Sequence, residues 1–169
     1  MNGETPGDND WEEHANDVDR VQSVALTVSQ PRSASYIADE AHVTKSTASE
    51  YLNHLVAINV LQDHHSDCAT LYSLDPLYDR MSSIRDLIDD NDRDTLEKRR
   101  EELKEQIVSW KDDYGANSPD LLRRQARNME PSGEARDLHQ TANVWRLALY
   151  RLSLIEEAMR NYVKYNRNA

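Results

Sequence analysis

The residues best suited to chemistry lie in one short run, TKSTASE, at positions 44–50. Four of its seven side chains carry a hydroxyl group, which can donate to phosphate oxygens or to the edges of bases. Lys45 adds a cation for phosphate or guanine, and the carboxylate of Glu50 can accept from a cytosine amino group. The run therefore predicts contacts with nucleic acid, or otherwise the polar, solvent-exposed face of a packing helix.

A helix, a tight turn and a second helix are predicted to hold this run in place. Ser33 or Ser35 can cap the first helix, and Thr44 can cap the second. His42 stands in the turn between the two helices. The hydroxyl-bearing side of the second helix should face outward, because its inward stripe consists of Ala48, Tyr51, Leu52, Leu55 and Val56.

Neighbouring segments complete a small domain around these helices. Apolar residues at helical spacing predict an earlier helix that starts near Asp17 and ends before Pro31. Short apolar segments at 60–61 and 71–74 bracket the polar tip HHSDCAT, as two strands of a β-hairpin would.

The second half of the chain is predicted to form long helices. Pro76 can open one, the acidic break DDNDRD precedes another, and Ser118-Pro119 can start a short one. Residues 135–164 contain no glycine or proline and predict one continuous last helix. The expected organisation is a disordered acidic tail at 1–15, a first domain at 16–76 and a helical extension at 77–169.

The last helix is apolar on more than one face. Such a helix can pack on its own chain and on a second copy, although a helical bundle within one chain would leave a similar pattern. We expect the first arrangement, with the extension forming a homodimer. The residues assigned to dimerisation are Val144, Trp145, Leu147, Leu152, Leu154, Ile155 and Met159.

The charge of the chain is unusual for a nucleic-acid-binding protein. Its 169 residues carry a formal charge of −11, and residues 21–76 contain six acids but only two cations, Arg32 and Lys45. Broad acidity with five Lys against fifteen Arg is typical of a high-salt cytoplasm, where ions screen the repulsion. The alternative is that the acidic domain docks a basic partner. The C-terminal arginines either supply charge for DNA or pair with the acidic stretch 86–113.

Several functional classes are not expected. No apolar run is long enough to span a membrane and no signal-peptide pattern opens the chain. The single cysteine, Cys68, provides no disulfide framework and fits a reducing cytoplasm. Neither a nucleophile elbow nor a phosphate-binding loop is present, so we do not expect an enzyme.

Two groups of potential metal ligands are also set aside. The hairpin tip offers His64, His65, Asp67 and Cys68, but a structural zinc site usually recruits two separated pairs of ligands. Acids within 90–101 have a calcium-loop spacing, yet Thr95 stands where that loop needs glycine. We therefore expect no metal and no other cofactor.

Residues 21–76 resemble the winged helix-turn-helix regulators of the ArsR and MarR type. The segment VTKSTASEYLNHLVAINVL is similar to their recognition helix, and TLYSLDP to the second strand of their wing. The long helices are similar to those of haloarchaeal winged-helix proteins of unassigned role. The resemblance implies a mainly α fold with a small β-hairpin wing, followed by long dimerisation helices. It also implies a left-handed or near-bridge backbone at His42, because these regulators usually have glycine at this turn position; histidine adopts such a backbone occasionally.

The resemblance also implies a function, namely sequence-specific binding of double-stranded DNA by a homodimer in transcriptional control. Two recognition helices would then lie about 34 Å apart, one helical turn of DNA. The alternative is a winged-helix scaffold for protein–protein interaction that does not bind DNA. The implied DNA contacts are Arg32, Thr44, Lys45, Ser46, Thr47, Ser49, Glu50 and Asn53, with His64 and His65 on the wing.

Overall fold

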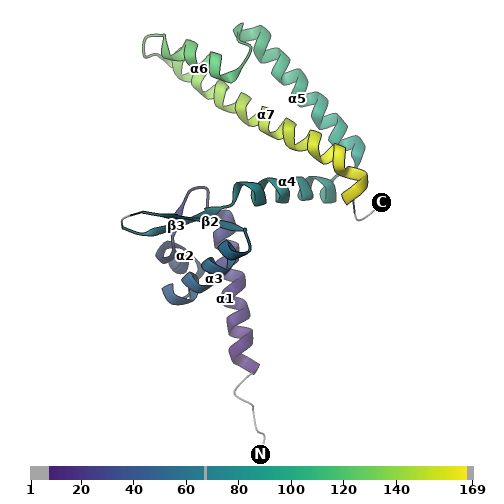
Figure 1. Ribbon diagram of the computed structural model, residues 1–169. Helices are drawn as coiled ribbons and strands as arrows, with labels where there is room; N and C mark the ends of the chain where they lie inside the picture. Colours follow the sequence, from purple (N-terminus) through teal and green to yellow (C-terminus); the bar gives the residue numbers. More distant parts are fainter. Residues whose placement is uncertain (1–7, 67, 167–169) are drawn as a thin grey trace, which may run out of the picture. The chain divides into compact units, whose positions relative to one another are not determined.

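A computed structural model describes residues 8–66 and 68–166, which are mainly helical with one small antiparallel sheet (Figure 1). The chain divides into two compact units, the first ending at Asp79 and the second beginning at Arg80. This division falls inside a helix, three residues beyond the boundary after residue 76 that was predicted from the sequence. None of the described helices is long and apolar enough to cross a membrane.

The first unit contains three helices and three strands. Its first helix starts earlier than expected, so residues 8–15 are helical although they were assigned to a disordered tail; residues 1–7 lie outside the described part. The elements are α1 (Asp8–Thr27), β1 (Arg32–Ser33), α2 (Ala34–Ala41), α3 (Lys45–Ala57), β2 (Leu61–His65) and β3 (Thr70–Leu74).

The sheet has the strand order β1-β3-β2, and β1 was not expected from the sequence. Strand β1 is only two residues long, too short for an alternating pattern, and it forms because Arg32 and Ser33 pair with Tyr72 and Leu71 of β3. The hairpin of β2 and β3 was expected, and its register places Leu61 opposite Leu74.

The helix starts around the turn follow the predicted caps. The Ser33 hydroxyl accepts from the Tyr36 N–H and caps α2, and the Thr44 hydroxyl accepts from the Thr47 N–H and caps α3. His42 between them has φ +56°, which confirms the left-handed backbone expected of the turn.

The core of the first unit contains the predicted stripe of α3. Ala48, Leu52 and Leu55 are buried, and Tyr51 and Val56 pack against the same cluster. The other buried members come from α1, α2, β2, β3 and the turn before β2, and are Val21, Ala25, Ala34, Ile37, Ala38, Ala41, Val60, Leu61 and Tyr72. The orientation of α3 is therefore fixed by burial of one side.

The second unit is built around one long helix. In Figure 1, α5 and α6 both lie along α7, which the contacts between these elements support. Gly115 ends α5 in a left-handed conformation, and the Ser118 hydroxyl caps α6, as the sequence predicted. The elements are α4 (Pro76–Asp90, in this unit from Arg80), α5 (Arg93–Tyr114), α6 (Pro119–Arg127) and α7 (Gly133–Tyr165).

Burial within the unit differs among the residues assigned to dimerisation. Trp145, which is 1% exposed, packs in one core cluster with α5 and α6, and Leu154 and Ile155 pack in another with α4 and α5. Leu152 and Met159 are half-buried against these clusters. Only Val144 and Leu147, which are 48% and 45% exposed, remain on the surface of the unit. Periodicity identified the apolar faces of α7 but not which neighbour covers each one.

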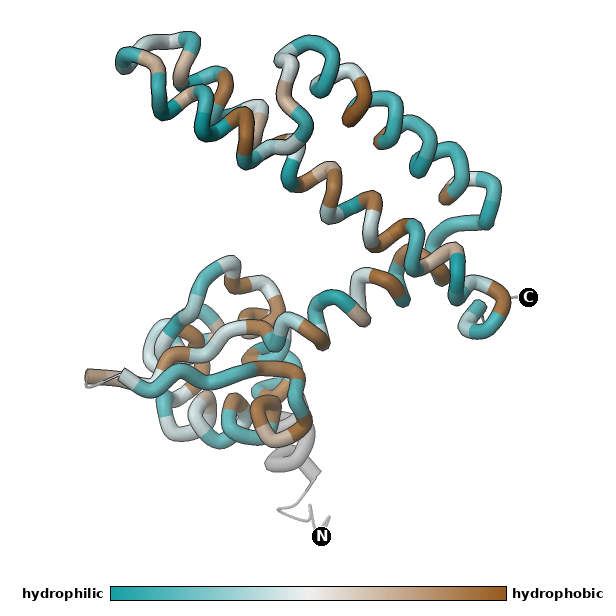
Figure 2. The backbone as a smooth tube through the Cα atoms, turned by 45° about the horizontal axis from the view of Figure 1, so that its top comes forward, coloured by the Kyte–Doolittle hydropathy of each residue, from teal (hydrophilic) through white to brown (hydrophobic). Residues whose placement is uncertain are grey.

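The ion pairs differ from the expected pairing of the C-terminal arginines with the acidic stretch 86–113. Among the described residues, no C-terminal arginine forms an ion pair with the stretch 86–113; Arg146 pairs with Asp120 at 3.0 Å instead. Hydrophilic residues predominate along α5 (Figure 2), and its acids pair with its own cations, because charges three or four residues apart meet on one helix. Examples are Lys98–Glu102, Arg100–Glu97 and Lys104–Glu101.

Candidate nucleic-acid interface

The first turns of α3 present the hydroxyl-and-lysine run outward within the first unit. The cap residue and the positions on the side away from the core are exposed, and two positions that flank the buried stripe are half-buried. The exposed residues are Thr44, Lys45, Ser46, Glu50 and Asn53, and the half-buried ones are Thr47 and Ser49. Among the residues that the structure describes, no other element of the first unit covers this face, so a partner can reach it.

The polar side chains of this face divide into two groups. Thr44 and Thr47 are engaged in the cap, since the Thr44 hydroxyl accepts from the Thr47 N–H at 3.1 Å and lies 2.8 Å from the Thr47 hydroxyl. By contrast, Lys45, Ser46 and Ser49 make no side-chain hydrogen bond or ion pair within the part of the chain that the structure describes. The second group is therefore free to donate to a ligand, while the threonines fix the start of the helix.

Asn53 has a structural contact that the sequence did not reveal. The hydroxyl of Tyr72 on β3 donates to the Asn53 Oδ1 at 3.1 Å, and the Tyr72 side chain is only 5% exposed. Burial, and then the nearby carboxylate of Asp63, raise the pKa of Tyr72, so the phenol stays a neutral donor. This hydrogen bond ties α3 to the hairpin and sets the position of one against the other.

The hairpin histidines are exposed but have polar partners within the hairpin. His64 and His65 are adjacent on β2, so their side chains point to opposite faces of the sheet. A ring nitrogen of His64 lies 3.1 Å from the Ser73 hydroxyl, and His65 lies 3.0 Å from the Asp63 carboxylate. Because Asp63 offsets its charge, His65 adds little net positive charge even when protonated. The predicted tip residue Asp67 lies outside the described residues.

Positive charge is scarce around this face. The Arg32 guanidinium lies 4.4 Å from the centre of the Tyr36 ring, a cation–π contact that holds it near the start of α2. Lys45 is exposed, but so are the acids Asp39 and Glu40 on α2. This face therefore offers a ligand hydrogen-bond donors more than positive charge.

Metal binding finds no support among the described residues. No three His, Cys, Asp or Glu side chains gather there closely enough to hold an ion. Within the acidic segment that has calcium-loop spacing, Asp92 is the N-cap of α5 and accepts from the Thr95 N–H at 2.7 Å. Hydrogen bonds from Thr95 lower the pKa of the Asp92 carboxyl, which is the behaviour of a helix cap.

Three contacts of the site were not predicted from the sequence. The Asp63–His65 pair could have been found, because residues two apart on a strand share one face. The Arg32–Tyr36 and Tyr72–Asn53 contacts had no local signal, since each depends on how β1 and β3 are placed against the helices.

Comparison with known families identifies the family of this chain but gives no function for it. The profile of a family of unknown function (DUF7342) matches residues 15–164, which span both units. The chain therefore belongs to this family. No curated protein and no solved structure matches it.

Proposed function

We propose that this member of the DUF7342 family is a winged helix-turn-helix protein that binds specific sequences of double-stranded DNA as a homodimer. Helix α3 acts as the recognition helix, and the β2–β3 hairpin is the wing. The protein would act in transcriptional control in the cytoplasm, without catalysing a reaction.

One observation carries this proposal: the first turns of α3 expose donors that no other part of the unit uses. Lys45 and Ser46 are exposed, Ser49 is half-buried beside them, and none makes a side-chain bond within the described residues. A major groove admits one helix, and hydroxyl and amine donors at the start of that helix reach base edges and phosphates. Capping by Thr44 and burial of Leu52 hold these donors in a fixed orientation.

Electrostatics determine how the affinity should respond to salt. If Arg32 and Lys45 of each subunit contact phosphates, a dimer neutralises about four, so log K should fall with log[salt] with a slope no steeper than about −4. Binding of this kind persists into concentrated KCl better than binding by a strongly basic protein.

The test is selection of random DNA duplexes by the full-length protein at KCl concentrations from low to multimolar, followed by fluorescence anisotropy on the enriched sequence. We expect a two-fold symmetric sequence whose half-sites lie about one helical turn apart. Replacing Lys45 and Ser46 together by Ala should abolish binding to it.

A matched control removes the same chemical groups elsewhere. Ser29 and Lys111 are exposed and lie outside α3, so the Ser29→Ala/Lys111→Ala variant loses one hydroxyl and one cation without altering the proposed interface. It should bind as the wild type does. No enriched sequence, or equal affinity of the Lys45→Ala/Ser46→Ala variant, would refute DNA recognition by α3.

A second candidate function is favoured by the acidity of the same unit. Exposed carboxylates on α2 and α3, including Asp39, Glu40 and Glu50, suit a protein-interaction scaffold that docks a basic partner. Such a scaffold would show no sequence-dependent DNA binding at any salt concentration, and its association with a basic protein would weaken steadily as KCl rises. The anisotropy titration therefore separates the two candidates.

A further inference from the structure

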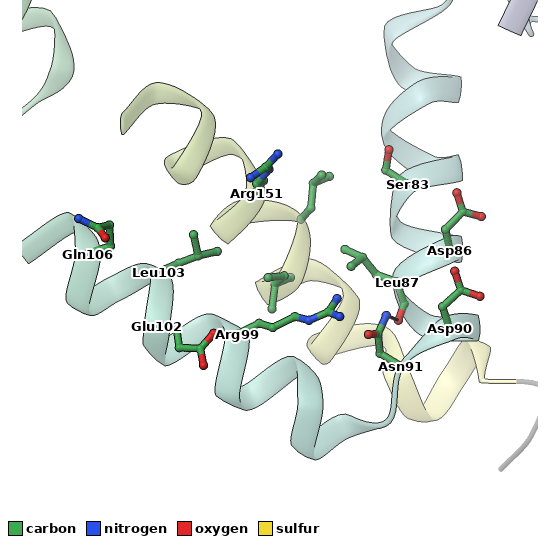
Figure 3. A pocket seen from close by; sticks show the side chains of 12 residues that line it. Ser83, Asp86, Leu87, Asp90, Asn91, Arg99, Glu102, Leu103, Gln106 and Arg151 are labelled. Atoms are coloured by element: carbon green, nitrogen blue, oxygen red, sulfur yellow. Dashed lines mark hydrogen bonds between the residues drawn. The ribbon is translucent and has the colours of Figure 1, made fainter. Parts of the chain in front are cut away.

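A groove in the second unit plays no part in the proposed DNA interface. It has a volume of about 850 Å³, and α4, α5 and α7 line it (Figure 3). Its apolar lining residues are Leu87, Leu103, Leu154 and Ile155.

The lining residues follow one face of each helix. On α5 they are three or four positions apart, at 99, 102, 103 and 106, and on α4 they are 83, 86, 87 and 90. Residues at this spacing form a continuous stripe along a helix. The groove thus presents one helical stripe from α4 and one from α5, and such stripes suit packing against another helix.

Charges of both signs lie at its rim without partners. Asp86 and Asp90 project from α4, and Arg151 from α7, as Figure 3 shows. All three are exposed, and none forms an ion pair or hydrogen bond within the described residues. A rim that carries both signs is complementary to a second copy of itself.

An apolar ridge leads directly into this groove. Val144 and Leu147 are about half exposed, and they continue with Arg151 and Leu154 at alternating spacings of three and four on α7. This is the heptad pattern of helices that pack side by side. The exposed part of the stripe therefore has the geometry required to cover the groove of another subunit.

We propose that this groove is the dimer interface, in which residues 144–151 of each α7 cover Leu87 and Leu103, the half-buried apolar residues of the partner's groove. A two-fold axis makes every contact twice. Because Arg151, Asp86 and Asp90 line one groove, an axis beside it brings each Arg151 close to the carboxylates of the other copy. The inference rests on the homodimer of the proposed function and identifies its surface.

Charge reversal tests this arrangement. The Arg151→Glu variant adds a fourth acid to a groove already lined by Asp86, Asp90 and Glu102, and the Asp86→Arg/Asp90→Arg variant replaces two of those acids by cations. Each alone should raise the dimer dissociation constant about tenfold or more, measured by analytical ultracentrifugation at low ionic strength. An equimolar mixture should form a heterodimer with an affinity close to that of the wild type, because opposite charges then meet in both copies of the contact.

Controls separate the interface from folding. Arg124 on α6 is exposed, unpaired within the described residues and outside the groove, so Arg124→Glu should leave dimerisation unchanged. Circular dichroism should show all variants folded, since the altered side chains have no partners to lose.

Three results would overturn the inference: a monomeric wild type at all concentrations, a dimer insensitive to both reversals, or a mixture that fails to associate. The first two would leave the groove to another protein or a small molecule. DNA affinity is measured separately, so DNA binding without this dimer, or this dimer without DNA binding, would show which of the two proposals fails.

Discussion

The hydrogen bond between Tyr72 and Asn53 predicts that one substitution, Asn53→Ala, destabilises the wild-type protein but stabilises a variant that lacks the Tyr72 hydroxyl. Asn53→Ala leaves the Tyr72 hydroxyl without a partner in a side chain that is 5% exposed, which costs about 1–3 kcal/mol. Alanine also favours the helix by about 0.6 kcal/mol relative to asparagine. The net effect should be a loss of stability of about 0.4–2.4 kcal/mol.

In the Tyr72→Phe background the same substitution should stabilise the protein. No hydroxyl is then left unpaired, so only the helix preference of about 0.6 kcal/mol remains. The two effects differ by the coupling energy of the pair, about 1–3 kcal/mol. Tyr72→Phe alone should lower the stability by about 0.5–1.5 kcal/mol, less than the cost of an unpaired Tyr72 hydroxyl. The reason is that Asn53 is exposed, so water can bind its side-chain carbonyl once the Tyr72 hydroxyl is removed.

Hydrogen exchange measured by mass spectrometry suits this cycle, because peptides from α3 and β3 report on the first unit alone. A change of 1 kcal/mol alters the exchange rate about fivefold. The exchange of α7 peptides serves as the internal control. If Asn53→Ala has the same effect in both backgrounds, the hydrogen bond contributes nothing and the wing is not held to α3 in this way.

Two further predictions concern the same unit. Thr44→Ala removes the cap of α3 and should cost about 1 kcal/mol in urea unfolding, whereas Thr44→Ser keeps the hydroxyl and should cost much less; equal losses would show that the cap contributes nothing. The raised pKa of Tyr72 means that the unfolded chain loses this proton first, so stability should decline as the pH rises above about 10 and continue to do so up to the folded-state pKa. The stability of the Tyr72→Phe variant should decline less over that range when thermal unfolding is measured as a function of pH. Parallel stability curves for the variant and the wild type would contradict the raised pKa of Tyr72.

The sequence predicted the local structure of the first unit because burial of one side decides it. The stripe through Ala48, Leu52 and Leu55 oriented α3, and the left-handed backbone at His42 was implied by the resemblance to winged helix-turn-helix regulators. Strand β1 was missed because two residues carry no periodicity and gain their structure only by pairing with β3.

The second unit shows a different limit of sequence reasoning. All apolar faces of α7 were visible, but Trp145, Leu154 and Ile155 are covered by its own chain rather than left for a partner. Hydrophobic periodicity reports that a face must be covered, whereas the identity of the cover depends on how the helices are arranged. The ion pairs of α5 are likewise local, because its acids pair with cations three or four residues away on the same helix and not with arginines distant in the sequence.

Acidity and DNA recognition are compatible under the proposed function if the surrounding salt is high. Release of counterions favours basic proteins only where the bulk salt is dilute, so extra cations contribute little affinity in multimolar KCl. Hydrogen bonds from Ser46 and Ser49 to bases do not depend on that release, and salt at that concentration screens the repulsion between Glu50 and phosphate over about 3 Å or less. A recognition helix with hydroxyl groups and a single lysine is then sufficient for specificity, while the acids elsewhere keep the protein soluble. The same reasoning requires that lowering the salt should raise affinity only modestly, in contrast to a protein whose binding depends on many arginines and lysines.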